Sequence, residues 1–163
     1  MPTEVNRSAP NARPLDSRLF LRDEELDRGA ALILSAERRL AAAVASEIKR
    51  ADLSRSELDI LIILHGQPGT TVSEVRDQLS LTVPTCARLL GRLDRRGLLD
   101  KNPTRKDARR RHLSLSDEAE ILMQPILAAL RDALRPAYRN AGAEHVSGAR
   151  TILELIAEEG RDG

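Results

Sequence analysis

Apolar residues recur at helical spacing along most of this 163-residue chain, and the pattern predicts a mainly α-helical protein. From Leu26 to Ile48, aliphatic residues return every three or four positions. The acidic run Asp23 to Glu25 just before them suits the positive end of a helix dipole. We therefore predict one long amphipathic helix over residues 23–50.

Two capping boxes, each a Ser or Thr followed three residues later by Glu, mark further helix starts. Ser54 and Glu57 open a helix over about residues 55–65, and Thr71 and Glu74 open a short one. In each box, each side chain can satisfy the other residue's otherwise unpaired amide. The inward positions of the short helix are Val72, Val75 and Leu79.

Another helix follows the short one after a tight turn. Thr82 can cap it, and Pro84 is tolerated because first-turn N–H groups have no intrahelical partner. Gly97 can adopt the left-handed conformation that ends a helix. The inward positions of this helix are Leu89, Leu90 and Leu93. Two short helices joined by about three residues form a helix-turn-helix pattern, in which the second helix reads DNA.

The chain beyond this helix predicts a wing. The runs LLDKNP and RRHLSL could pair as strands around the turn-rich residues 104–108, and a hairpin directly after a recognition helix is a wing. Ser116 then caps a helix that Pro125 and Pro136 should kink or divide, and a last helix is predicted over about 143–159. The predicted fold is therefore mainly α, a winged helix-turn-helix with a two-stranded β-hairpin wing.

We predict a flexible arm followed by a single domain. Residues 1–18 contain three prolines and no apolar periodicity, which predicts the arm, and residues 19–163 form the domain. Within it, 54–115 is the winged helix-turn-helix, while 23–50 and 116–160 carry apolar stripes that one compact monomer does not easily bury. We expect these helices to pair in a homodimer, with its recognition helices about 34–36 Å apart. The alternative is that the first and last helices cover each other within one chain.

The charge distribution indicates one surface suited to a polyanion. The chain carries a net charge of +1, but residues 82–112 hold ten Lys or Arg against three Asp, a net +7, and the remainder is −6. Because this basic block coincides with the recognition helix and the wing, it favours contact with nucleic-acid phosphates. The alternative is a solvated charged face without a partner.

Composition restricts the other classes of function. With 41% hydrophobic and 31% charged residues, the chain is typical of a folded protein. No apolar run approaches the roughly 20 residues of a membrane helix, and the N-terminus lacks a signal-peptide pattern, so we expect a cytoplasmic protein. One cysteine, three scattered histidines and the lack of catalytic or phosphate-loop motifs lead us to expect no metal, no cofactor and no enzymatic activity.

The stretch LLGRLDRRGLLDKNPTRKDARRRHLSLSDEAE, with the order of helices and wing around it, resembles the MarR/SlyA family of winged helix-turn-helix transcription regulators. The resemblance covers about residues 23–160, and its most specific part is the stretch from Arg88 through Leu115, which includes the D-x-R wing signature met by Asp107 and Arg109. It implies a homodimer that binds pseudo-palindromic double-stranded DNA, usually as a repressor, and often responds to a small-molecule effector.

The resemblance places DNA contacts along the exposed front of the recognition helix, at Thr82, Thr85, Cys86, Arg88, Arg92 and Arg95. Arg88 can donate two hydrogen bonds to guanine and Thr85 can offer its methyl to thymine, so both are candidates for sequence discrimination. Arg92 and Arg95 lie further along and are expected to bind phosphates. Cys86 leaves two interpretations, a small residue tolerated at the DNA surface or a helix N-terminal thiol with a lowered pKa. Some relatives sense peroxide through a cysteine near the N-terminus, which this chain lacks.

In the wing, basic residues are expected to reach the DNA backbone or the adjacent minor groove, whose narrow A·T tracts attract arginine. They are Arg105, Lys106, Arg109 and Arg111. Asp107 would repel phosphate, so its expected role is to pair with a nearby Arg and hold the shape of the wing.

A rival function remains open: a winged-helix interaction module whose basic surface docks an acidic protein or RNA. Preference for one duplex sequence by about 10³ over random DNA would separate the regulator from this module. An effector would lie between the dimerisation helices and the winged domain. Since Phe20 and Tyr138 are the chain's only Phe, Tyr or Trp residues, ring stacking is not the expected mode of effector recognition.

Overall fold

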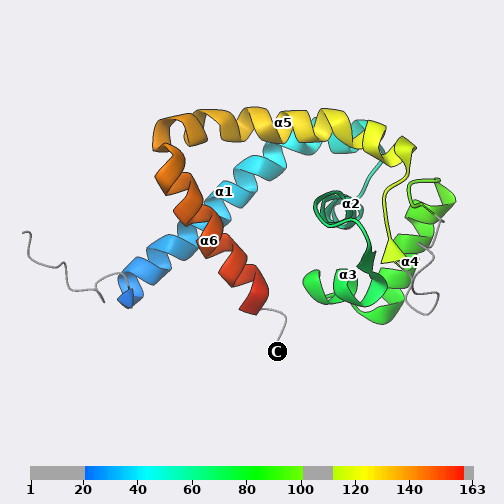
Figure 1. The fold of residues 1–163 in the computed structure, drawn as a ribbon, viewed down its shortest axis with the longest axis horizontal. Coiled ribbons are helices and arrows are strands. Elements are labelled where there is room, and N and C mark those ends of the chain that lie inside the picture. The colour runs from blue at the N-terminus through cyan, green and yellow to red at the C-terminus, as the bar shows by residue number, and fades with distance from the viewer. Residues whose placement is uncertain (1–20, 101–111, 160–163) are drawn as a thin grey trace, which may run out of the picture. The chain divides into compact units, whose positions relative to one another are not determined.

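The computed structural model describes residues 21–100 and 112–159, and these are mainly helical. The elements within these ranges are α1 (Asp23–Arg50), α2 (Arg55–Gly66), β1 (Thr70–Thr71), α3 (Val72–Gln78), α4 (Val83–Arg95), β2 (His112–Leu113), α5 (Asp117–Ala141) and α6 (Ala143–Glu159) (Figure 1). None of these helices is long and apolar enough to cross a membrane. The predicted mainly α fold is confirmed.

The chain divides into two compact units, residues 1–39 and 40–163. In the first unit the structure describes residues 21–39, which are helical from Asp23 onward. The large apolar side chains of this segment are exposed: Leu21, Leu26, Leu32, Ile33 and Leu34. Every buried residue of the described chain belongs to the second unit, which therefore contains the hydrophobic core.

The core of the second unit takes mostly aliphatic side chains from five helices, including Val44 of α1. It contains Leu58, Ile60, Leu61 and Leu64 of α2, Val75 of α3, Leu89, Leu90 and Leu93 of α4, and Ala119, Met123 and Ile126 of α5. Helix α2 packs against α4 and α5, α3 packs against α4, and the group lies beside the first part of α5 (Figure 1). Because each buried aliphatic side chain contributes roughly 1.5–3 kcal/mol, this cluster fixes the orientation of α4.

Side-chain caps determine where the helices of this unit begin. The Glu57 carboxylate accepts a hydrogen bond from the Ser54 N–H at 2.8 Å, while the Ser54 hydroxyl accepts one from the Glu57 N–H at 3.3 Å. Thr71 and Glu74 form the same reciprocal pair at the start of α3. The predicted caps are all confirmed: Ser54, Thr71, Thr82 and Ser116.

The short sheet differs from the predicted hairpin. The predicted pairing of LLDKNP with RRHLSL is confirmed at its base, where Leu99 bridges Leu115 and the Asp100 N–H donates to the Ser114 carbonyl at 2.9 Å. However, the strand β2 pairs with β1, a two-residue strand ahead of α3 that the sequence reading missed, in antiparallel register. The strand β1 therefore adds a pairing partner at the base of the predicted wing.

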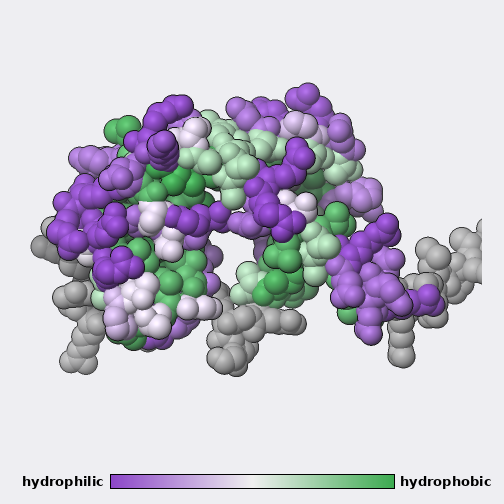
Figure 2. Space-filling view, turned by 180° about the vertical axis from the view of Figure 1, so that it is seen from behind, coloured by the Kyte–Doolittle hydropathy of each residue, from purple (hydrophilic) through white to green (hydrophobic). Residues whose placement is uncertain are grey.

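The two prolines of α5 do not divide it. Pro125 and Pro136 both lie inside one helix that runs from Asp117 to Ala141, so of the two expected outcomes, division was wrong. Gly142 caps the C-terminus of α5, and its positive φ of +81° separates α5 from α6. Four large apolar side chains of α6 are exposed: Ile152, Leu153, Leu155 and Ile156. Apolar residues also reach the surface in the space-filling view (Figure 2).

Candidate nucleic-acid interface

Helices α3 and α4 form the predicted helix-turn-helix. Helix α3 ends at Gln78, and the turn passes through Ser80 in the left-handed region at φ +49°. The Leu81 N–H donates to the Arg76 carbonyl at 2.9 Å, which closes the turn before Thr82 caps α4. The turn thus fixes α4 against α3 and directs its first residues outward.

One side of α4 lies in the core and the opposite side faces solvent. The buried side chains are Cys86, Leu89, Leu90 and Leu93. Arg88 and Arg95 are exposed, and because they are seven residues apart they share one face of the helix. The first turn of α4 contains no acidic residue. These are the properties of a helix that can meet a polyanion.

The two threonines of the first turn are bonded to each other. Thr82 is exposed and Thr85 is half-buried. The Thr82 hydroxyl donates to the Thr85 hydroxyl oxygen at 2.9 Å and accepts from the Thr85 N–H at 3.4 Å. Their DNA contacts stay predictions, but part of their hydrogen-bonding capacity is used within the cap.

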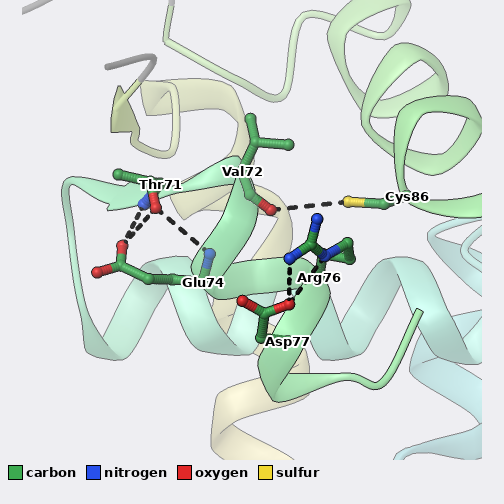
Figure 3. Close-up of polar contacts among 6 residues, drawn as sticks. All are labelled: Thr71, Val72, Glu74, Arg76, Asp77 and Cys86. Atoms are coloured by element: carbon green, nitrogen blue, oxygen red, sulfur yellow. Dashed lines mark hydrogen bonds and ion pairs between the residues drawn. The ribbon is translucent and has the colours of Figure 1, made fainter. Parts of the chain in front are cut away.

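The expected exposure of Cys86 was wrong. Its side chain is only 1% exposed, because it lies on the same side of α4 as the buried leucines, and its Sγ is 4.0 Å from the Val72 carbonyl oxygen (Figure 3). Burial raises the pKa of the Cys86 thiol above its ordinary value, Arg76 acts in the opposite direction and Asp77 adds to the increase. The interpretation as a reactive thiol with a lowered pKa is therefore also wrong.

Arg92 is held by a buried carboxylate. Its Nε lies 3.0 Å from Oε1 of Glu57, which is 0% exposed, whereas 42% of the Arg92 side chain is exposed. Burial would raise the pKa of Glu57, but hydrogen bonds from Ser54 and the charges of Arg92 and Arg96 outweigh it and lower the pKa. Phosphate binding by Arg92 stays a prediction, and this ion pair is a structural role that the sequence reading missed.

Arg96 is a second residue whose role the sequence reading missed. It follows the end of α4, and its two terminal nitrogens donate to the carbonyls of Ala51 and Asp52, both at 2.7 Å. These carbonyls belong to the turn that ends α1, so Arg96 attaches the end of α4 to that turn.

The sequence did contain a signal for the burial of Glu57, since it lies three and four residues before the buried Ile60 and Leu61. No comparable signal marked Arg96.

Hydrogen bonds also hold the base of the wing. His112 Nδ1 lies 2.7 Å from the Gly69 carbonyl oxygen, and the Ser116 hydroxyl donates to the Gly97 carbonyl at 2.7 Å. The predicted wing contacts themselves lie outside the described residues: Arg105, Lys106, Asp107, Arg109 and Arg111. Within the described ranges, no group of three or more His, Cys, Asp or Glu side chains could hold a metal ion.

The fold and the exposed basic helix define a winged helix-turn-helix protein. A model of the MarR family matches residues 51–110. The HTH-type transcriptional regulator PetP of Rhodobacter capsulatus is 31% identical over 154 residues, which cover 94% of this chain and 91% of that protein. The chain belongs to the MarR family and is a transcriptional regulator with a DNA-binding winged helix. Transcriptional regulators are not a class of enzyme.

Solved structures share this fold at lower identity. The crystal structure of NadR in complex with 4-hydroxyphenylacetate matches with a TM-score of 0.68 and 20% identity, over 96% of this chain and 98% of that one. A mutant of S. aureus MepR bound to oligodeoxyribonucleotide matches with a TM-score of 0.53 and 17% identity, over 80% and 96%. At these identities the likeness shows the fold alone.

Proposed function

We propose that this protein is a homodimeric repressor that binds pseudo-palindromic double-stranded DNA and inserts α4 of each protomer into the major groove. The observation that carries the proposal is the solvent face of α4, where Arg88 and Arg95 are exposed opposite the buried leucines. Arg88 would donate two hydrogen bonds to guanine, and Arg95 would bind a phosphate. The likeness to MepR bound to oligodeoxyribonucleotide supports the part of the proposal that concerns DNA binding.

The wing would add contacts beside the major groove. Arg105, Lys106, Arg109 and Arg111 would bind the backbone or enter the minor groove, and Asp107 would pair with one of these arginines. His112 and Ser116 support this part of the proposal, because their bonds to Gly69 and Gly97 hold the base from which the wing extends.

Dimerisation would use apolar side chains that this chain leaves exposed. Leu26, Leu32, Ile33 and Leu34 on α1 and Ile152, Leu153, Leu155 and Ile156 on α6 are all at least 40% exposed. Monomeric proteins rarely expose so many large apolar residues on their helices, and a second copy would cover them. A dimer would bring two copies of α4 to half-sites about 34–36 Å apart. Sedimentation analysis should therefore give twice the mass of one chain.

A response to a small molecule is a finer part of the proposal. The fold relative NadR binds 4-hydroxyphenylacetate. Tyr138 is the only Phe, Tyr or Trp among the residues that the structure describes, and it is exposed. An effector would therefore be held by aliphatic side chains rather than by ring stacking. Release of bound DNA by a panel of small aromatic and aliphatic acids tests this part.

A selection of binding sites from random duplexes at physiological salt tests the proposal. Arg88→Ala should weaken binding to the selected site by roughly 1–3 kcal/mol and relax the preference at one base pair. Lys106→Ala should weaken all duplexes alike and reduce the salt slope by about one. Arg131→Ala, which removes an exposed arginine from α5, is the control and should change neither quantity. An equal loss on all sequences for Arg88→Ala would remove Arg88 from base readout.

The second candidate function is an interaction module for an acidic protein or RNA, which the basic charge of residues 82–112 also favours. Sequence-specific DNA binding should give a preference of about 10³ or more for one duplex over random DNA. If no duplex is preferred over the random pool, the repressor proposal is refuted and the module becomes the better description. A reporter gene with the selected site in its promoter then tests repression directly.

A further inference from the structure

Val83 is a large apolar side chain that the core of the winged domain does not use. It is the first residue of α4, directly after the cap Thr82, and 64% of it is exposed. Within residues 51–100, all of which the structure describes, the other exposed large apolar residue is Ile62 of α2, at 38%. Exposure of a valine at the start of a recognition helix therefore calls for an explanation other than packing.

The neighbours of Val83 define the chemistry of this surface. Ala87 is exposed and lies one helical turn later, so both side chains project from the same side of α4. Thr82 and Thr85 bond to each other through their hydroxyls at 2.9 Å. The side of the first turn that carries Val83 and Ala87 thus presents methyl groups rather than hydrogen-bonding groups.

Thymine is the base that presents a methyl group in the major groove, and side chains recognise that group by apolar contact. Recognition helices contact base edges through their N-terminal residues, which is where Val83 lies. We propose that Val83 is a specificity-determining residue that contacts the 5-methyl group of a thymine in each half-site. The half-site would therefore combine a thymine with the guanine assigned to Arg88. The proposal rests on the proposed function, since it requires α4 to lie in the major groove.

The test removes single methyl groups from the DNA. Each thymine of one half-site in the selected duplex is replaced in turn by deoxyuridine, which keeps the base pairing, and binding of the full chain is measured by fluorescence anisotropy. We expect one replacement to weaken binding by about fourfold, because burial of one methyl contributes roughly 0.8 kcal/mol. In Val83→Ala, binding to the thymine duplex should fall, and the same deoxyuridine should then cost less than about 1.5-fold.

A matched control separates this contact from exposure in general. Ile121 of α5 is 72% exposed and also β-branched, and Ile121→Ala should keep the full sensitivity to deoxyuridine. Circular dichroism of Val83→Ala should match the unaltered protein, since the residue contributes little to the core. Retained sensitivity in the control and lost sensitivity in Val83→Ala support the proposal.

Two negative outcomes have different meanings. If the selection yields no preferred duplex, the proposed function and the role of Val83 fail together. If a preferred duplex emerges but deoxyuridine changes binding by less than about 1.5-fold at every position, the role of Val83 is refuted while the proposed function stands. The same holds if the loss caused by deoxyuridine is equal in Val83→Ala and the unaltered protein.

Discussion

Replacing Glu57 by glutamine removes the buried charge that holds the recognition helix. The Glu57 carboxylate is fully buried, lies 3.0 Å from Arg92 Nε and accepts two hydrogen bonds from Ser54, one from the N–H at 2.8 Å and one from the hydroxyl at 2.7 Å. Glutamine keeps the shape and one accepting oxygen, so the cap can persist. What it loses is the charge that faces Arg92.

The expected cost follows from the burial of the two partners. Breaking a fully buried ion pair costs about 3–5 kcal/mol, but Arg92 is 42% exposed and can regain water, which reduces the penalty. Hydrogen bonds to charged groups contribute about 1.5–3 kcal/mol and neutral ones about 0.5–1.5 kcal/mol. We therefore expect Glu57→Gln to lower the free energy of unfolding by about 2 kcal/mol. For a chain of this length, Tm should fall by about 4–8 °C.

Urea unfolding followed by circular dichroism, at pH 7 and one fixed protein concentration, measures this change. Asp59→Asn is the control on the same helix, because it removes an ion pair with Arg55 whose two side chains are 31% and 51% exposed. Such a pair contributes no more than about 0.5 kcal/mol. A loss for Glu57→Gln as small as that of the control would refute the assigned role of the buried carboxylate.

The pH dependence supplies an independent check. The folded-state pKa of Glu57 is lowered from its ordinary value of 4.5, so its ionisation stabilises the protein fully above about pH 4.5. As pH falls below that value the unfolded chain takes up the proton first, and the stabilisation is lost progressively toward the lower folded-state pKa. The difference between the unaltered protein and Glu57→Gln should therefore shrink from pH 5.5 to pH 3.5. A constant difference over that range would contradict this origin.

Three further predictions concern single positions in the winged helix-turn-helix or at the start of α5. Gly97→Ala should lower the free energy of unfolding by about 1–2 kcal/mol, because the backbone φ at this position is +70°, although no atom lies within 4 Å of the added Cβ. Gly148→Ala inside α6 is the control and should raise the free energy of unfolding slightly. Equal effects of the two changes in urea unfolding would be inconsistent with backbone strain at Gly97. Ser116→Ala should cost about 1–2 kcal/mol through loss of the cap on Ala119, measured in the same way, and no change would show that the cap is replaceable. Cys86 should react with a thiol reagent at least about a hundredfold more slowly in the native protein than in urea, and rapid native labelling would contradict its burial.

Local signals predicted the starts of the helices well. A cap such as Ser54 with Glu57 lies within four residues, and its energy does not depend on the rest of the fold. The apolar spacing likewise identified Leu89 and Leu93 as buried. These features were readable because both partners of each interaction are close in the sequence.

Features that depend on distant packing were not readable in the same way. Cys86 follows a capped first turn, and only the packing of α3 over it decides that the thiol is buried. Arg96 bonds to carbonyls more than forty residues earlier in the chain, which no local pattern indicates. The strand β1 is two residues long and exists because β2 lies beside it, so its sequence carries no alternation to detect.

The base of the wing also determines where this protein can change in length. The Asp100 N–H donates to the Ser114 carbonyl, and the Ser116 N–H donates to the Leu98 carbonyl, so two backbone hydrogen bonds join the segments on either side of residues 101–111. Residues added between Asp100 and His112 would leave these two hydrogen bonds in place, and we therefore expect them not to shift α4 or α5. A residue added between Gly97 and Asp100 would instead break the register with Leu115 and disturb both helices. Evolution or engineering can thus alter the reach of the wing while the recognition helix keeps its place.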